Sequence, residues 1–315
     1  MSPISRRLVL AAGLSATLGI AACAPAGLSA SNSPTPEGGP TSPEQSPAGQ
    51  DSAAPESSAP AETSPTPEPS PTTPSPDPSA VLPGTNHNAA AKEYAYPAAD
   101  VQAWVEKRSA PEEKVVFLTF DDGPNHSTTV QILDILKEHQ VPATFFVIGR
   151  LVDGAADVLK REIAEGHAVA LHSYSHNYKK LYPGRKAKVE TIVDEFNESK
   201  KVIRGVLGED YDTNCWRYPG GHMSWKNMEP ADEALAAEGT HWIDWNCMTG
   251  DAEPESRRPT TARQMVNMAV SPIFEEKNAS IMLAHDAEGK DLTVQALPGI
   301  IEEYKKAGYK FGVIA

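Results

Sequence analysis

The sequence predicts an α/β fold, a parallel barrel formed by residues 112–315, behind an exported N-terminal part. Short apolar runs rich in β-branched and aromatic residues alternate with segments of helical periodicity. About seven such strand–helix units fit into this one stretch, which favours a parallel barrel over a doubly wound sheet. Acidic, histidine and arginine residues directly follow several of these predicted strands. Because the chemistry of such a barrel lies in the loops after its strands, these residues are candidates for a catalytic site.

Residues 1–23 are typical of an export signal. Arg6 and Arg7 resemble the arginine pair of a twin-arginine export signal. They precede an apolar segment that is short for a membrane-spanning helix. This segment ends in Ile20-Ala21-Ala22-Cys23, which resembles a bacterial lipobox. It predicts that Cys23 is the lipidated first residue of a mature lipoprotein on the outer face of the cell membrane. An ordinary secretory signal with an incidental cysteine is the alternative.

Residues 24–84 are rich in Pro, Ser, Thr, Ala and Gly. They carry too little apolar surface to offset the entropy of the chain, so we expect a disordered tether that reaches into the cell wall. The whole chain has 28 Lys and Arg against 42 Asp and Glu, a net charge of -14. Such a balance argues against nucleic acid or an anionic membrane surface as a partner.

A mixed lead-in, residues 85–111, is expected to pack on the barrel and to contain a helix through residues 101–105. The domain then opens with a strand at residues 115–120, which ends in Asp121-Asp122-Gly123-Pro124. Ser127 is a suitable N-cap for the next helix, which ends near His139. The other predicted strands lie at residues 144–147, 167–171, 215–218, 241–246, 280–284 and 310–314, and the clearest helices at residues 190–207 and 293–307.

Asp121 and Asp122 are the first candidates for chemistry. A strand closed by an Asp-Gly turn is the simplest interpretation of such a sequence. Two adjacent carboxylates after a buried strand, however, repel one another unless a cation, a metal ion or a shared proton offsets their charges. The sequence therefore directs attention to residues that could supply that offset.

His172 and His176 follow the predicted strand at residues 167–171. Two imidazoles four residues apart lie on one side if the segment makes a single helical turn, which suits the binding of one metal ion. Two surface or capping histidines are the alternative. One Asp with two His makes an open three-ligand site, typical of catalytic rather than structural zinc. The second carboxylate of the acid pair is then free to act as a base.

Three further segments end predicted strands. In Arg217-Tyr218-Pro219-Gly220-Gly221, the guanidinium could form a salt-bridged turn or could hold a base ionised, and the glycines let backbone N–H groups approach an oxyanion. Asp251 follows the strand at residues 241–246. His285 ends the run that begins at Ile281, where a core histidine is the alternative.

Together these motifs resemble the polysaccharide deacetylase family, the fourth family of carbohydrate esterases. The resemblance covers residues 114–315 and rests on the segments Thr119–Pro124, His172 with His176, Arg217–Gly221, Asp251 and Leu283–His285. It implies a distorted (β/α)7 barrel, a single catalytic domain after the linker. It also implies metal-dependent removal of N-acetyl, or sometimes O-acetyl, groups from polysaccharides.

The resemblance also implies roles for the site residues. Asp122, His172 and His176 would bind a divalent ion, most often zinc in this family although others are used. Asp121 would take a proton from a water on this ion, since a metal lowers the pKa of water from 15.7 towards about 7 to 9. Arg217 would orient Asp121.

On the opposite side of the pocket, His285 would protonate the departing amine, and Asp251 would tune His285 for this role. A backbone N–H in the turn from Tyr218 to Gly220 would help to hold the oxyanion, and Leu283 would line a pocket for the acetyl methyl group. These roles complete the set of residues that the family resemblance implies.

The sequence departs from the family pattern at two places that line the substrate groove. The run Met248–Ala252 keeps only the second Asp of an Asp-Xaa-Xaa-Asp-Trp motif, and Gly220 stands where an aromatic residue usually ends the Arg-Xaa-Pro motif. These losses affect the expected specificity more than the activity. Trp225, Trp242 or Tyr182 could stack on sugars instead, with packing as the alternative for each. His126 and His222 lie near the motifs but are not expected to be ligands.

Cys215 and Cys247 are the cysteines left after Cys23. They lie in predicted strands expected to be neighbours, so an exported protein could join them in a disulfide, and two buried free thiols are the alternative.

The sequence thus predicts a monomeric, tethered N-deacetylase of extracellular glycan, with peptidoglycan amino sugars preferred because the protein would be anchored beside the cell wall. Chitin-like, exopolysaccharide or xylan substrates are the alternatives. A catalytically silent glycan-binding module is a third hypothesis. The full set of base, orienting arginine and acid argues against such a module, because binding alone does not need them.

Overall fold

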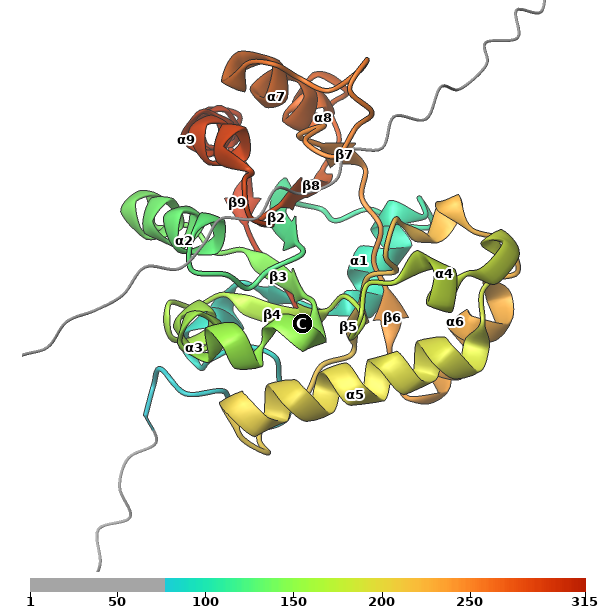
Figure 1. Cartoon of the computed structure of the whole chain (residues 1–315). Coiled ribbons are helices and arrows are strands. Elements are labelled where there is room, and N and C mark those ends of the chain that lie inside the picture. The colour runs from blue at the N-terminus through green and yellow to red at the C-terminus, as the bar shows by residue number, and fades with distance from the viewer. Residues whose placement is uncertain (1–76) are drawn as a thin grey trace, which may run out of the picture. The chain divides into compact units, whose positions relative to one another are not determined.

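A curled parallel sheet forms the centre of the structure, a computed structural model that describes residues 77–315 (Figure 1). The strands are β1 Ala95–Tyr96, β2 Val115–Asp121, β3 Thr144–Val147, β4 Ala168–Leu171, β5 Cys215–Trp216, β6 His241–Trp242, β7 Cys247–Met248, β8 Ala279–His285, β9 Lys310–Phe311 and β10 Val313–Ile314. The sheet runs in the order β6-β5-β4-β3-β2-β8-β7, with β9 beside β2, and all these pairs are parallel. The distorted (β/α)7 barrel that the family resemblance implies is confirmed.

Helices surround this sheet (Figure 1). They are α1 Ala98–Val105, α2 Thr128–His139, α3 Ala156–Ala164, α4 Tyr178–Leu181, α5 Val189–Leu207, α6 Glu229–Ala237, α7 Ala262–Ala269, α8 Ser271–Phe274 and α9 Asp291–Lys306. Within residues 77–315, no helix is both long and apolar enough to cross a membrane.

The central strand β2 is buried along its whole length, which explains its continuous apolar sequence. Val116, Leu118 and Phe120 pack in the same cluster as the buried residues of the outer helices, whereas Val115 and Phe117 pack in a second cluster inside the barrel. Because successive side chains of a strand point to opposite faces, residue 121 shares the inward face of Phe117. The strand therefore delivers a carboxylate to the barrel interior.

The segment before the barrel lies at the end where the strands begin. In α1, Ala98 and Val101 are buried in the inner cluster, together with the first residues of β2 and β8. The short strand β1 pairs with β10, and the ring of Tyr96 packs edge-on against Phe117 with ring centroids 5.3 Å apart. This segment therefore lies at the opposite end of the barrel from the loops after the strands.

Three predicted strands are wrong in their extent. The strand expected at residues 215–218 ends at Trp216. The strand expected at residues 310–314 divides into β9, which pairs with β2, and β10, which pairs with β1. The chain turns at Gly312, where a Cβ atom would lie 2.7 Å from the Tyr96 ring and 2.9 Å from Phe117. The strand expected at residues 241–246 ends at Trp242, because the carbonyl of Ile243 accepts a hydrogen bond from a buried side chain inside the barrel.

The start of α2 differs from the predicted cap. Ser127 makes no side-chain capping bond. Instead Oδ1 of Asn125 accepts hydrogen bonds from the backbone N–H groups of residues 127, 128 and 129. An Asn side chain two residues earlier thus satisfies the free donors of the first turn.

Cys215 and Cys247 are free, buried thiols. Their strands, β5 and β7, lie near opposite ends of the sheet order rather than side by side. The thiol of Cys247 instead lies 3.2 Å from the hydroxyl of Ser280. The structure therefore contains two free thiols, which was the alternative to a disulfide.

We expect Phe117→Ala to lower the free energy of unfolding by about 3–5 kcal/mol, because it opens a cavity between the barrel interior and the ring of Tyr96. Urea unfolding of the full chain followed by tryptophan fluorescence measures this change. The matched control is Phe274→Ala, whose side chain is 78% exposed and should change the free energy by less than about 0.5 kcal/mol. Equal midpoints for the two variants would contradict the packing described above.

Candidate active site

A pocket of about 340 Å³ opens where the strands end. Its wall includes these predicted site residues: Asp121, Asp122, His172, His176, Gly220, Asp251, Leu283 and His285. Arg217 and Tyr218 lie behind this wall, both fully buried. Cys23 lies outside the described residues. The structure therefore gathers residues that are up to 164 positions apart in the sequence.

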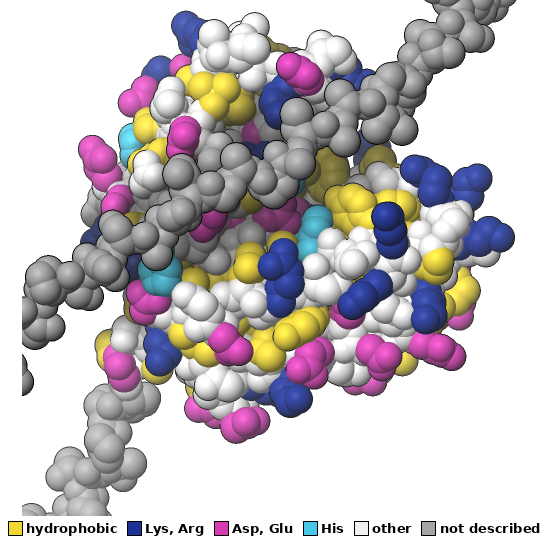
Figure 2. All heavy atoms as spheres, viewed as in Figure 1, with side chains coloured by type: hydrophobic (Ala, Val, Ile, Leu, Met, Phe, Trp, Pro, Cys, Tyr) yellow, Lys and Arg dark blue, Asp and Glu magenta, His cyan; other side chains and the backbone are white. Residues whose placement is uncertain are grey.

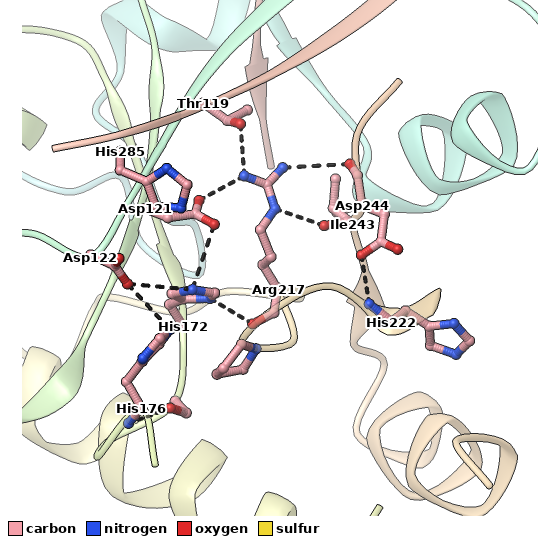
Figure 3. A network of polar contacts seen from close by, with 12 residues as sticks. Thr119, Asp121, Asp122, His172, His176, Arg217, His222, Ile243, Asp244 and His285 are labelled. Carbon is pink, nitrogen blue, oxygen red and sulfur yellow. Dashed lines mark hydrogen bonds and ion pairs between the residues drawn. The ribbon is translucent and has the colours of Figure 1, made fainter. Parts of the chain in front are cut away.

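Asp121 and Arg217 form a buried ion pair at the base of the pocket (Figure 3). The guanidinium donates to Asp121 Oδ1 at 2.7 Å, to the hydroxyl of Thr119 at 2.7 Å and to the carbonyl of Ile243 at 2.9 Å. It also lies 3.9 Å from the ring centre of Phe146. The carboxylate is thus held in one orientation by a cation that is itself fixed on several sides.

Burial raises the pKa of Asp121, while the charge and hydrogen bond of Arg217 lower it and so partly offset the burial. The second oxygen of the carboxylate, Oδ2, makes no hydrogen bond to Arg217 and lies 3.5 Å from Nε2 of His172. Asp121 therefore has one oxygen for orientation and one directed towards the pocket, where it could accept a proton.

Asp122, His172 and His176 come together beside this pair (Figure 3). One ligand atom from each lies within 4.8 Å of the other two. Oδ1 of Asp122 is 3.3 Å from Nε2 of His176 and 3.7 Å from Nε2 of His172, and within the described chain this buried oxygen has no hydrogen-bond partner. A buried carboxylate oxygen without a donor is costly, so this position suits a cation.

The protonation of His172 supports the same conclusion. Nδ1 lies 2.8 Å from the carbonyl of Arg217, and since a carbonyl only accepts, Nδ1 carries the proton. Burial, with the neighbouring His176, lowers the pKa of His172 to about 3, so the ring is neutral. Nε2 then points a lone pair at carboxylate oxygens, and the two repel each other. A metal ion between them would be coordinated by both and would remove this repulsion.

The loop that carries both histidines is not the predicted helical turn. Ser173 and His176 adopt left-handed backbone conformations, with φ of 65° and 51°, and so does Asp122 with φ of 82°. Residues other than glycine rarely adopt this conformation, and it is found where the surroundings impose it. The histidines meet because the loop folds back, with Ser173 Oγ accepting from the His176 N–H at 2.9 Å.

Glu195 of α5 holds this loop from behind, a role that the sequence analysis missed. Its carboxylate accepts from the backbone N–H of Ser175 at 3.0 Å and from the Ser175 hydroxyl at 2.5 Å. The side chain lies in a helix about twenty residues from the motif and is buried. An acidic residue on the buried face of an amphipathic helix was the one signal in the sequence.

His285 lies beside Asp121, at the paired position of the neighbouring strand β8. Its Nδ1 is 2.8 Å from Asp251 Oδ1. Burial alone would lower the pKa of His285, but the hydrogen bond and charge of Asp251 outweigh it and raise this pKa to about 8. His285 is thus suited to carry a proton at neutral pH.

Asp251 is itself held by several donors. Oδ2 accepts from the backbone N–H of His285 and from the hydroxyl of Thr293, both at 2.8 Å, and Lys290 donates to the Asp251 carbonyl at 2.9 Å. Burial opposes ionisation, yet the hydrogen bond and charge of His285 prevail, so that the pKa of Asp251 falls to about 2. The pair is therefore an ionised carboxylate and a charged imidazole.

Two apolar side chains and a glycine turn complete the pocket. Leu283 and Met248 line it from the adjacent strands β8 and β7. Gly220 has φ of 80°, and the turn is closed by a hydrogen bond from Gly221 N–H to the Tyr218 carbonyl at 2.8 Å. In the described part of the chain, the Tyr218 N–H donates to no protein acceptor.

The aromatic residues of the groove differ from those predicted. Tyr182 stacks on Trp225 with ring centroids 4.0 Å apart, and Trp242 stacks on His222 at the same separation, so Tyr182 and Trp242 serve packing. Tyr178 and Trp245 line the pocket instead. Tyr178 is two residues after His176, and this position was the available signal. His126 pairs with Asp157 at the surface, and neither it nor His222 joins the metal cluster.

Known proteins resemble this chain over its barrel. A family model described as Polysaccharide deacetylase matches residues 108–235. A peptidoglycan-N-acetylglucosamine deacetylase of Bacillus cereus is 34% identical over 208 residues, which make up 64% of this chain and 69% of that protein. A bifunctional xylanase/deacetylase of Pseudobutyrivibrio xylanivorans is 33% identical over 204 residues, 64% of this chain but 30% of that protein.

A solved structure agrees with these relatives. A Streptococcus mutans CE4 esterase is 42% identical, with a TM-score of 0.70, and the match covers 76% of this chain and 100% of that one. This chain belongs to the polysaccharide deacetylase family and is a polysaccharide deacetylase, a hydrolase.

Proposed function

We propose that this enzyme is a metal-dependent N-deacetylase of peptidoglycan amino sugars. The observation that carries the proposal is the convergence of Asp122, His172 and His176 next to a separate carboxylate, Asp121, that Arg217 orients. Three ligands leave positions open for water and substrate, which is the pattern of a catalytic metal site. A binding module has no use for the oriented carboxylate.

Asp122, His172 and His176 would hold a divalent ion, with zinc favoured by two nitrogen donors and one oxygen donor. Such an ion would lower the pKa of a water molecule and polarise the acetamide carbonyl. Asp121 would take a proton from the attacking water through Oδ2, because Oδ1 is occupied by Arg217. Arg217 thus acts as a positioning residue for the base.

His285 would supply the proton that completes the reaction. It would donate its proton to the departing amine, while Asp251 keeps the imidazole charged and correctly turned. The Tyr218 N–H, at the turn that contains Gly220, would donate to the oxyanion, a contact typically worth about 3 kcal/mol. Leu283 would contact the acetyl methyl group, since it lines the same pocket.

The relatives support the substrate and the location. One is named a peptidoglycan-N-acetylglucosamine deacetylase, and such a substrate lies outside the membrane. The name of the bifunctional xylanase/deacetylase keeps xylan as the alternative substrate. We further propose that residues 1–23 direct export, that Cys23 is lipidated, and that the chain after Cys23 tethers a monomeric enzyme to the cell wall. The disorder expected for residues 24–84 does not extend to the end of that range, because Val81 is buried and the Gly84 N–H donates to the Asp210 carbonyl at 2.8 Å.

We expect Asp121→Asn to lower kcat for acetate release from peptidoglycan by about 10²- to 10⁴-fold, because an amide cannot accept the proton. The amide keeps an oxygen for Arg217, so the fold and the metal ligands should survive. Acetate release, metal content and far-UV circular dichroism of the full chain measure the three effects.

Asp134→Asn, on the exposed side of α2, is the matched control and should leave kcat unchanged. Wild-type protein stripped with a chelator should lose activity and regain it with zinc. If Asp121→Asn releases acetate at the wild-type rate, Asp121 is not the base.

We expect Asp251→Asn to move the alkaline limb of kcat/KM to lower pH by about one unit. Asp251 raises the pKa of His285 to about 8, and without its charge this pKa falls towards the ordinary 6.5. Since the proposed acid works only when protonated, activity should then be lost at lower pH. A pH–rate profile checks this, and an unshifted limb would remove His285 from the role of acid.

We expect Glu195→Gln to weaken zinc binding about tenfold, because its amide cannot accept from both donors of Ser175. Calorimetric titration of zinc into the stripped protein measures this effect apart from activity. Glu198→Gln, three residues along the same helix with a partly exposed side chain, is the control and should bind zinc as the wild type does. Equal affinities for both variants would show that Glu195 does not position the loop.

A further inference from the structure

A group of exposed cations lies beside the pocket, and we name it the basic rim. It consists of Lys179, Lys180, Arg185, Lys186, Lys188 and Lys226, all exposed to solvent. Figure 2 shows Lys and Arg side chains gathered over the region of α4, next to the hollow that contains histidine and acidic side chains. The basic rim therefore borders the opening of the active site.

The charge of the basic rim is opposite to that of the chain as a whole. The protein carries a net charge of -14, yet residues 178–188 contain five Lys and Arg and no Asp or Glu. Among the ion pairs of residues 77–315, none involves a cation of the rim. Other lysines do find partners, such as Lys137 with Glu165 and Lys306 with Glu303. The rim cations are therefore free for an external anion.

The backbone holds two of these like charges side by side. Lys186 and Lys226 are directly opposed in a parallel β-bridge, closed by hydrogen bonds from Ala187 N–H to the Lys226 carbonyl and from Lys226 N–H to the Arg185 carbonyl. Like charges in opposed positions are destabilising. An anion bound across these two lysines would offset their repulsion, which would explain why the backbone holds unpaired cations together.

The basic rim is continuous with the pocket wall. Lys179 directly follows Tyr178, which lines the pocket, and the guanidinium of Arg185 donates to the carbonyl of Ser224, another wall residue, at 2.7 Å. The same guanidinium lies 5.4 Å from the ring centre of Trp225. A polymer whose reacting sugar lies in the pocket would meet the rim within its neighbouring units.

We propose that the basic rim binds anionic groups carried by the glycan strand whose sugar is in the pocket. The inference rests on the proposed function and narrows its substrate to a polyanionic glycan. Carboxylates of stem peptides and phosphates of attached wall polymers share the required chemistry. Chitin-like chains and xylan chains without acidic substituents have no charge for these cations to bind, so they gain nothing from the rim.

The test compares two variants of the full chain that lose equal charge. The rim variant combines K179Q, K180Q, K186Q and K188Q. The control combines K137Q, K201Q, K306Q and K310Q, all of which lie outside the rim and pair with acids. Acetate release is measured on peptidoglycan and on neutral N-acetylglucosamine oligomers, and co-sedimentation with insoluble peptidoglycan is measured in parallel.

We expect the rim variant to raise KM on peptidoglycan about tenfold at low salt with kcat unchanged, because several exposed charge contacts are lost at once. The difference should shrink at about 0.5 M salt, where charges are screened within a few ångströms. KM on the neutral oligomers should stay within about twofold of the wild type. The control should match the wild type on both substrates.

Two treated substrates identify the anion. If amidase removal of stem peptides abolishes the difference between the variants, the rim binds peptide carboxylates. If hydrofluoric acid extraction abolishes it, the rim binds phosphates of attached polymers. Equal KM and equal co-sedimentation of the rim variant and the control would overturn the proposal, and so would an equal rise in KM on neutral oligomers. Absence of acetate release by the wild type contradicts the proposed function instead, and co-sedimentation then still tests the rim.

Discussion

The buried pair of Arg217 and Asp121 is the interaction on which the rest of the site depends. Taking both charges out of water costs several kcal/mol for each ion, and only good geometry with further hydrogen bonds repays it. The guanidinium gains these contacts from Thr119, from the carbonyl of Ile243 and from the face of Phe146. Its own backbone carbonyl fixes the proton of His172. One residue therefore sets the orientation of the proposed base and the tautomer of a proposed metal ligand.

This pair also shapes the chain around it. The backbone after β6 gives its carbonyl at Ile243 to Arg217, so the strand stops and the chain crosses to β7 at the other end of the sheet. Next to the pair, Asp122, Ser173 and His176 hold left-handed conformations that their local sequence disfavours. These conformations persist because Glu195 and the ends of the strands hold the loops. Contacts in the surrounding scaffold thus offset the free-energy cost of the strained backbone.

Sequence reasoning succeeded where a single physical rule governs a segment. The run Val115–Asp121 reads as a buried parallel strand, and its period of two places Asp121 inside the barrel. The rule failed where contacts distant in sequence decide the conformation. The loop after His172 depends on Glu195, and Gly312 turns the last strand because Tyr96 and Phe117 occupy the space beside it. Neither contact has a local signature, so the helical turn and the long last strand were wrong.

Charge is arranged differently in the pocket and in the basic rim. In the pocket, Arg217 offsets the charge of Asp121 and His285 offsets that of Asp251. Asp122 is left as the carboxylate of these three that the proposed metal ion would offset. Such an ion would act within the pocket, because water and salt screen its field over about a Debye length. A polyanionic strand bound across the opening therefore needs a second positive region outside it, and residues 178–188 provide one in a chain that is otherwise acidic. The pocket and the basic rim are thus two parts of one electrostatic arrangement, in which the proposed chemistry requires the first and a charged substrate the second.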